Sequence, residues 1–203
     1  MTQKPIKQGA IISAAAVAAA AIALTVFCQS HAPMPPWLKG LGPVQLVRDI
    51  NYTEGLAEPA HRLDLVAPAG HRGALPLIVY IHGGAWIGGD KWDCPGAILV
   101  KAGYAVASVN YRLADQAKFP AQINDLKAAI RYLRAHARQY NIDAQKIGVW
   151  GHSAGGHLAA LLGTTCGVTE LEGKEGNPHL SSCVQAVCDW SGPSNLVSIA
   201  GQC

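Results

Sequence analysis

Apolar residues in this chain occur as short continuous runs that alternate with segments of helical periodicity. The runs are rich in β-branched residues, which predicts buried strands. They fall at residues 44–52, 61–66, 75–81, 104–109, 147–150 and 184–189. Helical patterns fall between them, at residues 95–102, at 119–140 and after residue 153. This alternation predicts an α/β fold, with a mostly parallel sheet and helices on both of its faces.

The longest helical pattern, at residues 119–140, has an apolar face and a basic face. Ile123, Leu126, Ile130 and Leu133 recur at the spacing of one helix face, and basic residues lie on the other. We therefore expect an amphipathic helix here.

Residues 1–32 differ from the rest of the chain. Lys4 and Lys7 precede an uncharged, alanine-rich run from Ala10 to Cys28, which is the design of a secretory signal peptide. The run is also long enough to cross a bilayer, so an uncleaved membrane anchor is the alternative, and a lipoprotein anchor at Cys28 is a third. In each case the two lysines keep the N-terminus inside, so the protein is predicted to be exported, periplasmic or secreted.

Composition and charge narrow the possible functions. Residues 33–43 are rich in proline and glycine, which predicts a linker. Residues 44–203 then form one domain with a substantial core, in line with a hydrophobic content of 50%.

The net charge of +3 is not gathered on one face, so no nucleic-acid partner is expected. His152 and His157 are five residues apart, which does not suit two metal ligands on one helix face, and no metal or cofactor is expected.

Candidate chemistry centres on the sequence between Ile147 and His157. An apolar run stops at Gly151-His152-Ser153-Ala154-Gly155, and helical periodicity resumes directly afterwards. A G-x-S-x-G motif between a strand and a helix is the nucleophile elbow, in which a sharp turn presents the serine hydroxyl. Gly151 and Gly155 flank the serine because larger side chains would collide there. Ser153 is therefore the candidate nucleophile.

A second glycine-containing loop follows the predicted strand at residues 75–81. Its sequence is His82-Gly83-Gly84-Ala85-Trp86. Glycines at the end of a strand let backbone N–H groups turn into a cleft, where they can stabilise an oxyanion. His82 is expected to support this loop through hydrogen bonds rather than to titrate in catalysis.

These motifs together resemble the α/β-hydrolase family. The similarity is to secreted carboxylesterases, a branch that includes feruloyl- and acetylxylan-esterase-like enzymes and relatives of hormone-sensitive lipase. It rests on the elbow and the His82 loop, and on three further stretches: Asn110-Tyr111-Arg112-Leu113, Phe119-Pro120-Ala121 leading to Asp125, and Asp189-Trp190-Ser191-Gly192-Pro193.

The resemblance implies roles for several residues. The N–H groups of Gly84, Ala85 and Ala154 would form the oxyanion hole, with Gly83 shaping the turn. Arg112 would pair with Asp125 as a structural brace, with an exposed charge on the helix as the alternative for Asp125. Trp86 and Trp190 would wall an acyl pocket.

The catalytic triad is incomplete in this sequence. In the resembled fold the acid and the histidine follow the serine along the chain. After Ser153 only His157 and His179 occur; the first is expected to face a neighbouring element, and the second lies too early for the base. Asp189 is a low-ranking candidate for the acid, because this branch places its acid and histidine after two further strands. The predicted domain therefore lacks the last two strands of the fold and is C-terminally incomplete.

Six cysteines in an exported chain suggest disulfide bonds. Cys166 and Cys183 bracket a polar excursion, and we predict that they pair. Cys188 lies in an apolar run and is predicted to be a buried thiol, whereas Cys94 and Cys203 have no assignable partner.

The sequence thus predicts a serine hydrolase that acts on small-molecule or carbohydrate-linked carboxylic esters. The isolated chain is expected to be inactive, because the acid and the histidine are missing. A serine peptidase or amidase of the same fold, or a truncated non-catalytic homologue, are the alternatives.

Overall fold

The computed structural model describes residues 34–53 and 58–199, and the described residues from Pro35 onward form one compact unit. The predicted signal or anchor at residues 1–32 lies outside the described residues. In the part that is described, no helix combines the length and apolar character needed to cross a membrane.

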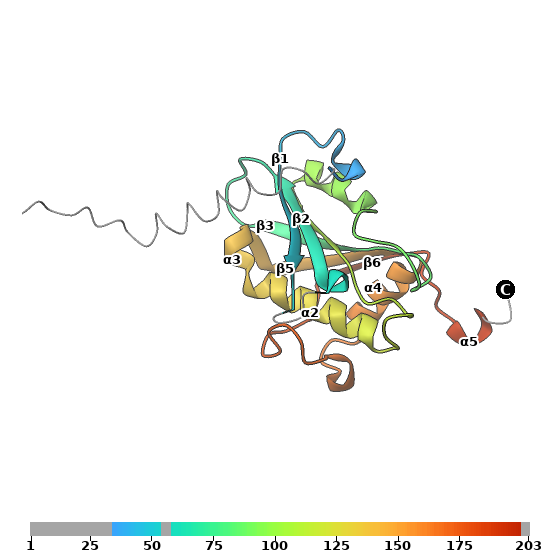
Figure 1. Ribbon diagram of the computed structural model, residues 1–203. Helices are drawn as coiled ribbons and strands as arrows, with labels where there is room; N and C mark the ends of the chain where they lie inside the picture. Colours follow the sequence, from blue (N-terminus) through green and yellow to red (C-terminus); the bar gives the residue numbers. More distant parts are fainter. Residues whose placement is uncertain (1–33, 54–57, 200–203) are drawn as a thin grey trace, which may run out of the picture. The chain divides into compact units, whose positions relative to one another are not determined.

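Six strands form one mixed sheet in the order β1-β2-β4-β3-β5-β6. The first two pairings, β1 with β2 and β2 with β4, are antiparallel, and β4, β3, β5 and β6 run parallel. The predicted mostly parallel sheet is confirmed. The strands are β1 (Val44–Asn51), β2 (Arg62–Pro68), β3 (Leu75–Ile81), β4 (Ala105–Val109), β5 (Ile142–His152) and β6 (Ala186–Trp190) (Figure 1).

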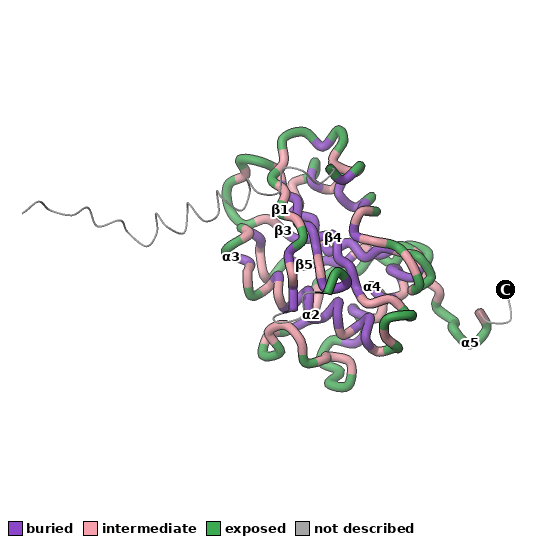
Figure 2. Tube along the Cα trace, in the orientation of Figure 1, coloured by how far each residue is buried: buried purple, intermediate pink, exposed green. Residues whose placement is uncertain are grey.

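Helical segments cover both faces of the sheet, and Figure 2 shows buried residues along the central strands and α2. Side chains of alternate strand residues enter two separate cores: Val79 packs under the α-helices, and Tyr80 under the 3-10 segments. The first face carries α2 (Ala121–Ala135), α3 (Ala137–Tyr140) and α4 (Ala154–Thr164), and the second carries η1 (Pro36–Leu38) and η3 (Pro95–Ala102). Three short segments complete the list: η2 (Pro59–His61), η4 (Thr169–Leu171) and α5 (Leu196–Ile199).

The described part of the proline- and glycine-rich segment packs against the domain. Trp37 and Leu38 of η1 contact the second core, and Leu41 is buried in it. These apolar side chains leave water by covering η3, so this part of the predicted linker belongs to the compact unit.

The basic face of α2 is buried, which the amphipathic pattern does not predict. Lys127 and Arg131 are at most 1% exposed. Lys127 Nζ lies 2.7 Å from Glu172 Oε1 and also donates to the carbonyl of Thr165, while Arg131 donates to the carbonyls of Gly176, Glu172 and Glu175. These cations are buried because the polar excursion between α4 and β6 covers them and supplies the acceptors they need.

A disulfide closes this excursion. Cys166 and Cys183 are bonded, with their Cα atoms 5.0 Å apart, so the predicted pairing is confirmed. The prediction of a buried Cys188 is wrong. Cys188 lies in β6, and all five residues of that strand are exposed because it is paired, among the described strands, only with β5.

Candidate active site

Ser153 lies at the turn that joins β5 to α4. Its backbone has φ 55° and ψ −121°, a conformation that non-glycine residues rarely adopt. A Cβ atom on Gly151 would fall on the carbonyl of Gly155, and one on Gly155 would fall on the carbonyl of Ile81. The close approach of β3, β5 and α4 therefore requires glycine on both sides of the serine, as the motif predicts.

The loop after β3 lies directly against this turn. A Cβ atom on Gly83 would be 2.9 Å from the carbonyl oxygen of His152 and 3.3 Å from Cβ of Ser153. Gly84, Ala85 and Trp86 follow with φ values of 114°, 53° and 60°. The structure thus brings residues 83–86 beside the candidate nucleophile.

Free backbone donors are present on both sides of Ser153. Within the described residues, the N–H groups of Gly84 and Ala85 donate no hydrogen bond. Ala154 is the first residue of α4, so its N–H has no acceptor inside the helix. These are the donors that the sequence assigns to an oxyanion hole, and the position of Ala154 also places the positive end of the helix dipole beside the serine.

His82 supports the loop after β3 through a hydrogen bond and a ring contact. Its Nδ1 donates to the carbonyl of Gly83 at 2.8 Å, and its ring stacks on Tyr111 with centroids 4.4 Å apart. The Tyr111 hydroxyl donates to the carbonyl of His82 at 3.0 Å. Burial lowers the pKa of His82 although its bond to Gly83 acts in the opposite direction, which favours the neutral ring. This agrees with the predicted supporting role.

Among the described residues, no side chain that could act as a base is hydrogen-bonded to the candidate nucleophile. Within the described residues, the hydroxyl of Ser153 makes no hydrogen bond. His157 packs edge-on against Trp86 with ring centroids 5.3 Å apart, so it faces a neighbouring element as expected. Burial lowers its pKa, and Asp189 partly opposes that effect. His179 lies in the polar excursion beside Leu180 and Cys183.

Asp189 is the residue before the last one of β6, and its side chain takes part in the turn that follows the strand. Its Oδ1 accepts a hydrogen bond from the N–H of Gly192 at 2.8 Å. The last residue of β6 also contacts the elbow: the N–H of Ser153 donates to the carbonyl of Trp190 at 2.8 Å. The carboxylate thus lies near the start of α4 without a histidine partner among the hydrogen bonds of the described residues.

A cavity of about 380 Å³ lies beside the elbow and is lined almost entirely by apolar atoms. Trp86 lines it, as predicted for a pocket wall, but Trp190 does not; its ring packs against Trp150 and His152 instead. No sequence motif marks the remaining wall. It comes from the segment after β4 and from α2, α4 and α5: Ala114, Phe119, Gln122, His157, Leu158, Leu161 and Leu196.

The family model named BD-FAE, an α/β-hydrolase family, matches residues 63–203, which is more than half of the chain. The chain belongs to the BD-FAE family. The matched region contains the loop after β3 with Gly83 to Trp86, the elbow and β6.

Relatives of this BD-FAE chain include named esterases. Carboxylesterase NlhH of Mycobacterium tuberculosis is 42% identical over 94 residues, which cover 45% of this chain and 30% of the relative. Isoprenylcysteine alpha-carbonyl methylesterase ICME of Arabidopsis thaliana is 31% identical over 157 residues, covering 76% of this chain and 36% of the relative. The chain spans between about a quarter and a third of the length of the curated relatives that it matches.

Solved structures show the same fold. A truncated carbohydrate esterase from gut microbiota superimposes with a TM-score of 0.70 and is 38% identical, with 77% of this chain and 60% of that chain covered. A bifunctional GH43-CE protein of Bacteroides eggerthii gives a TM-score of 0.70 and 42% identity, with 73% and 21% covered. The predicted α/β-hydrolase fold is therefore confirmed.

Proposed function

We propose that this BD-FAE domain supplies the nucleophile and the oxyanion hole of a serine hydrolase that acts on carboxylic esters. The observation that carries the proposal is the strained turn at Ser153, which lies against a loop whose backbone donors at Gly84 and Ala85 have no partner among the described residues. Named esterases among the relatives support the same reaction class.

The reaction would follow from this geometry. The Ser153 oxygen attacks the ester carbonyl carbon, and the negative charge that forms on the carbonyl oxygen is stabilised by N–H groups of Gly84, Ala85 and Ala154. Collapse of the tetrahedral intermediate expels the alcohol and leaves an acyl-serine, which water then hydrolyses. The serine proton must pass to a base and on to the leaving alcohol.

We also propose that the 203-residue chain is inactive by itself. A serine hydroxyl is a weak nucleophile at neutral pH unless a positioned base accepts its proton. The hydroxyl of Ser153 has no hydrogen-bond partner among the described residues, and the nearby His157 packs on Trp86. The oxyanion donors alone would leave only a small part of the catalysis.

The apolar cavity suggests where the substrate lies. Because Trp86 and His157 connect its wall to the Gly83 loop and to the first turns of α4, an acyl group bound to Ser153 could extend into it. A volume of about 380 Å³ lies within the usual range for small-molecule sites. One of the structural relatives is a carbohydrate esterase, which supports esters linked to carbohydrate as the substrate class.

A chimera tests the proposed reaction. Residues 35–192 would be joined to the remaining segment of the 38% identical carbohydrate esterase. We expect the chimera to hydrolyse p-nitrophenyl acetate and to lose that activity in Ser153→Ala. A chimera that hydrolyses p-nitroanilides but not p-nitrophenyl acetate would instead favour an amidase. A folded chimera without either activity would favour a non-catalytic homologue.

We propose that the protein is exported. Lys4, Lys7 and the uncharged run up to Cys28 support a secretory signal or an anchor. The disulfide between Cys166 and Cys183 supports an oxidising compartment.

A further inference from the structure

The loop between β3 and η3 needs an external support to keep its conformation. Gly84, Ala85 and Trp86 have positive φ values in succession, and two of them are not glycine. Such backbone conformations persist only where the surrounding structure imposes them. Around these residues, the carbonyl of Gly84 accepts bonds from the N–H groups of Ile87 and Gly88 at 3.0 Å each. Contacts with the rest of the domain therefore support the loop: the N–H of Ala114 donates to the carbonyl of Trp86 at 2.8 Å, and further contacts hold the end that returns to η3.

Lys91 holds the returning end of the loop through three of its polar groups. Its N–H donates to Asn110 Oδ1 at 2.6 Å, and its carbonyl accepts from the hydroxyl of Ser108 at 2.8 Å. Its Nζ lies 2.8 Å from Oδ1 of Asp64 on β2 and 3.0 Å from Oδ1 of Asp49 on β1. One residue thus connects the loop to β1, β2 and the end of β4.

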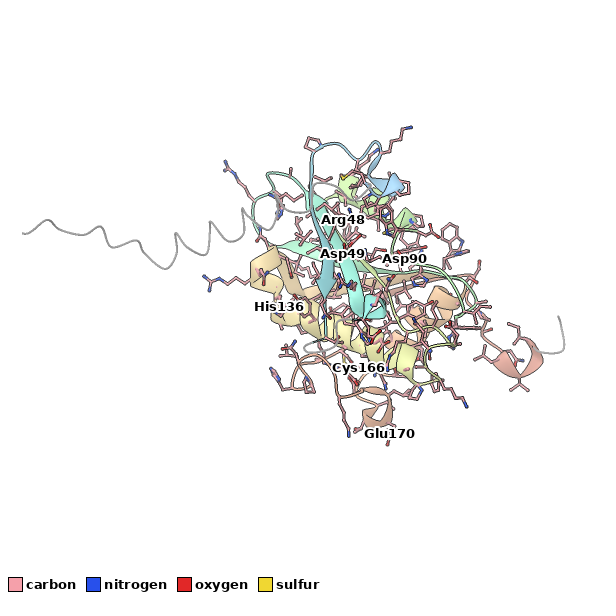
Figure 3. The ribbon with its side chains drawn as sticks, in the orientation of Figure 1. Arg48, Asp49, Asp90, His136, Cys166 and Glu170 are labelled. Carbon is pink, nitrogen blue, oxygen red and sulfur yellow. A yellow bond between two sulfur atoms is a disulfide. The ribbon has the colours of Figure 1, made fainter. Side chains whose placement is uncertain are left out.

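The neighbour of Lys91 adds a fourth connection. Asp90 Oδ2 accepts a hydrogen bond from Nδ2 of Asn110 at 3.0 Å, so the same asparagine side chain holds two consecutive loop residues. Figure 3 labels Asp90 in the loop and Asp49 on β1, the two acidic residues at the ends of this network.

The charged side chain of Lys91 is almost fully buried, which is uncommon for lysine. The lysine side chain is 4% exposed and that of Asp64 is fully buried, whereas that of Asp49 is 40% exposed. A buried ion pair contributes little net stability compared with apolar residues of similar volume, because both charges lose their hydration. Its geometry is nevertheless fixed, since moving either partner would leave a buried charge unpaired.

We propose that Lys91 is a positioning residue whose ion pairs with Asp64 and Asp49 hold the Gly83–Gly88 loop in the conformation that presents its free N–H groups. This inference rests on the proposed oxyanion-hole role of Gly84 and Ala85. Loss of the ammonium group would remove the ties to β1 and β2 and leave the bonds to Asn110 and Ser108, and the strained residues would relax before the sheet itself unfolds.

Amide hydrogen exchange of the full chain tests the inference without any catalytic assay. The reporters are the amides of Ile87 and Gly88, followed by NMR. In Lys91→Met we expect both to exchange at least about tenfold faster, with little change for amides in β3 and α4. Lys127→Met is the matched control: this lysine is equally buried and paired with Glu172, but it contacts the excursion. It should accelerate exchange near Glu172 and leave Ile87 and Gly88 unchanged.

Two results would overturn the inference. One is unchanged exchange of Ile87 and Gly88 in Lys91→Met; the other is an equal acceleration in Lys127→Met, which would indicate a loss of global stability only. If Lys91→Met does not fold, Asp49→Asn decides, because the half-exposed Asp49 can lose its charge without leaving a buried gap. This variant should accelerate the exchange of the same two amides by a smaller factor, and unchanged exchange would contradict the proposed role of Lys91. Because exchange does not depend on ester hydrolysis, these outcomes remain separate from a failure of the proposed function.

Discussion

Asp125 accepts hydrogen bonds from both the backbone and the side chain of Arg112. The Arg112 N–H lies 2.9 Å from Oδ2, and Nη2 lies 2.6 Å from Oδ1. Nε2 of His61 also lies 3.3 Å from Oδ1 of the same fully buried carboxylate. The pair fixes the start of the segment between β4 and α2, which includes Ala114 and Phe119 of the cavity wall. The structural brace implied by the family resemblance is present.

This brace predicts a pH dependence of stability. Burial raises the pKa of Asp125, but His61 and Arg112 outweigh burial and hold the pKa below its ordinary value. A depressed carboxylate pKa contributes stability that is complete above the unfolded-state pKa of about 3.9 and is lost as the pH falls through the folded-state value. In Arg112→Met, which leaves the buried carboxylate less well paired, we expect a loss of about 3 kcal/mol at pH 7.

The loss in Arg112→Met should shrink below about pH 4, where protonation removes the buried charge. Urea unfolding between about pH 3 and pH 7 measures this difference. Arg138→Met is the control, since Arg138 is exposed on α3 and its loss changes the net charge equally. A similar pH dependence in both variants would show that net charge, and not the brace, is responsible.

Alanine should be tolerated much less well at Gly155 of the elbow than at Gly88 of the loop after β3. In Gly155→Ala the new methyl group would meet the carbonyl of Ile81 on β3, so α4 and the sheet must separate. We expect a loss of about 2 kcal/mol or more in the free energy of unfolding. In Gly88→Ala the nearest atom is the carbonyl oxygen of Gly84 at 3.9 Å, and the loss should stay within about 0.5 kcal/mol. Equal losses in chemical denaturation would contradict the close packing at the elbow.

The disulfide predicts a redox-dependent stability. Cys166 and Cys183 are 17 residues apart, and a crosslink that closes a loop of this length typically contributes about 3 kcal/mol. Cys166→Ala combined with Cys183→Ala should lower the melting temperature of the oxidised protein to that of the reduced protein. Cys188→Ala, at the exposed thiol on β6, serves as the control and should melt like the parent. An unchanged melting temperature in the double variant would show that Lys127 and Arg131 hold the excursion without the crosslink.

Local sequence patterns predicted the strands, the elbow and the crosslink, because each depends on residues that lie close together along the chain. Burial of Arg131 could not be predicted in this way, since its acceptors, the carbonyls of Glu172, Glu175 and Gly176, follow more than forty residues later. Cys188 was assigned from the apolar character of its strand, whereas its exposure depends on the position of that strand in the sheet.

The candidate site was predictable only in part. Ser153 and residues 83–85 belong to two motifs, and the fold brings these motifs together as expected. The cavity wall joins Trp86, Gln122 and Leu196 from three parts of the chain, and no local pattern marks them as neighbours. Trp190 was assigned to that wall from its motif, yet its ring packs on Trp150.

Export makes a separate prediction about the N-terminus. If residues 1–32 are a cleaved signal, mass spectrometry of the exported protein should find a first residue between His31 and Pro36. Recovery of intact Met1 in the membrane fraction would favour an uncleaved anchor, and a lipid-modified Cys28 would favour a lipoprotein.

The most direct test of the central claim is labelling of Ser153 with a fluorophosphonate, which reacts with a serine that a base has activated. The chain by itself and the chimera with the carbohydrate-esterase segment would be compared, each with its Ser153→Ala variant. We predict rapid labelling of Ser153 in the chimera and none above the Ser153→Ala background in the chain alone. Rapid labelling of the chain alone would contradict the claim that it lacks a base, and a folded chimera without labelling would contradict the assignment of Ser153 as the nucleophile.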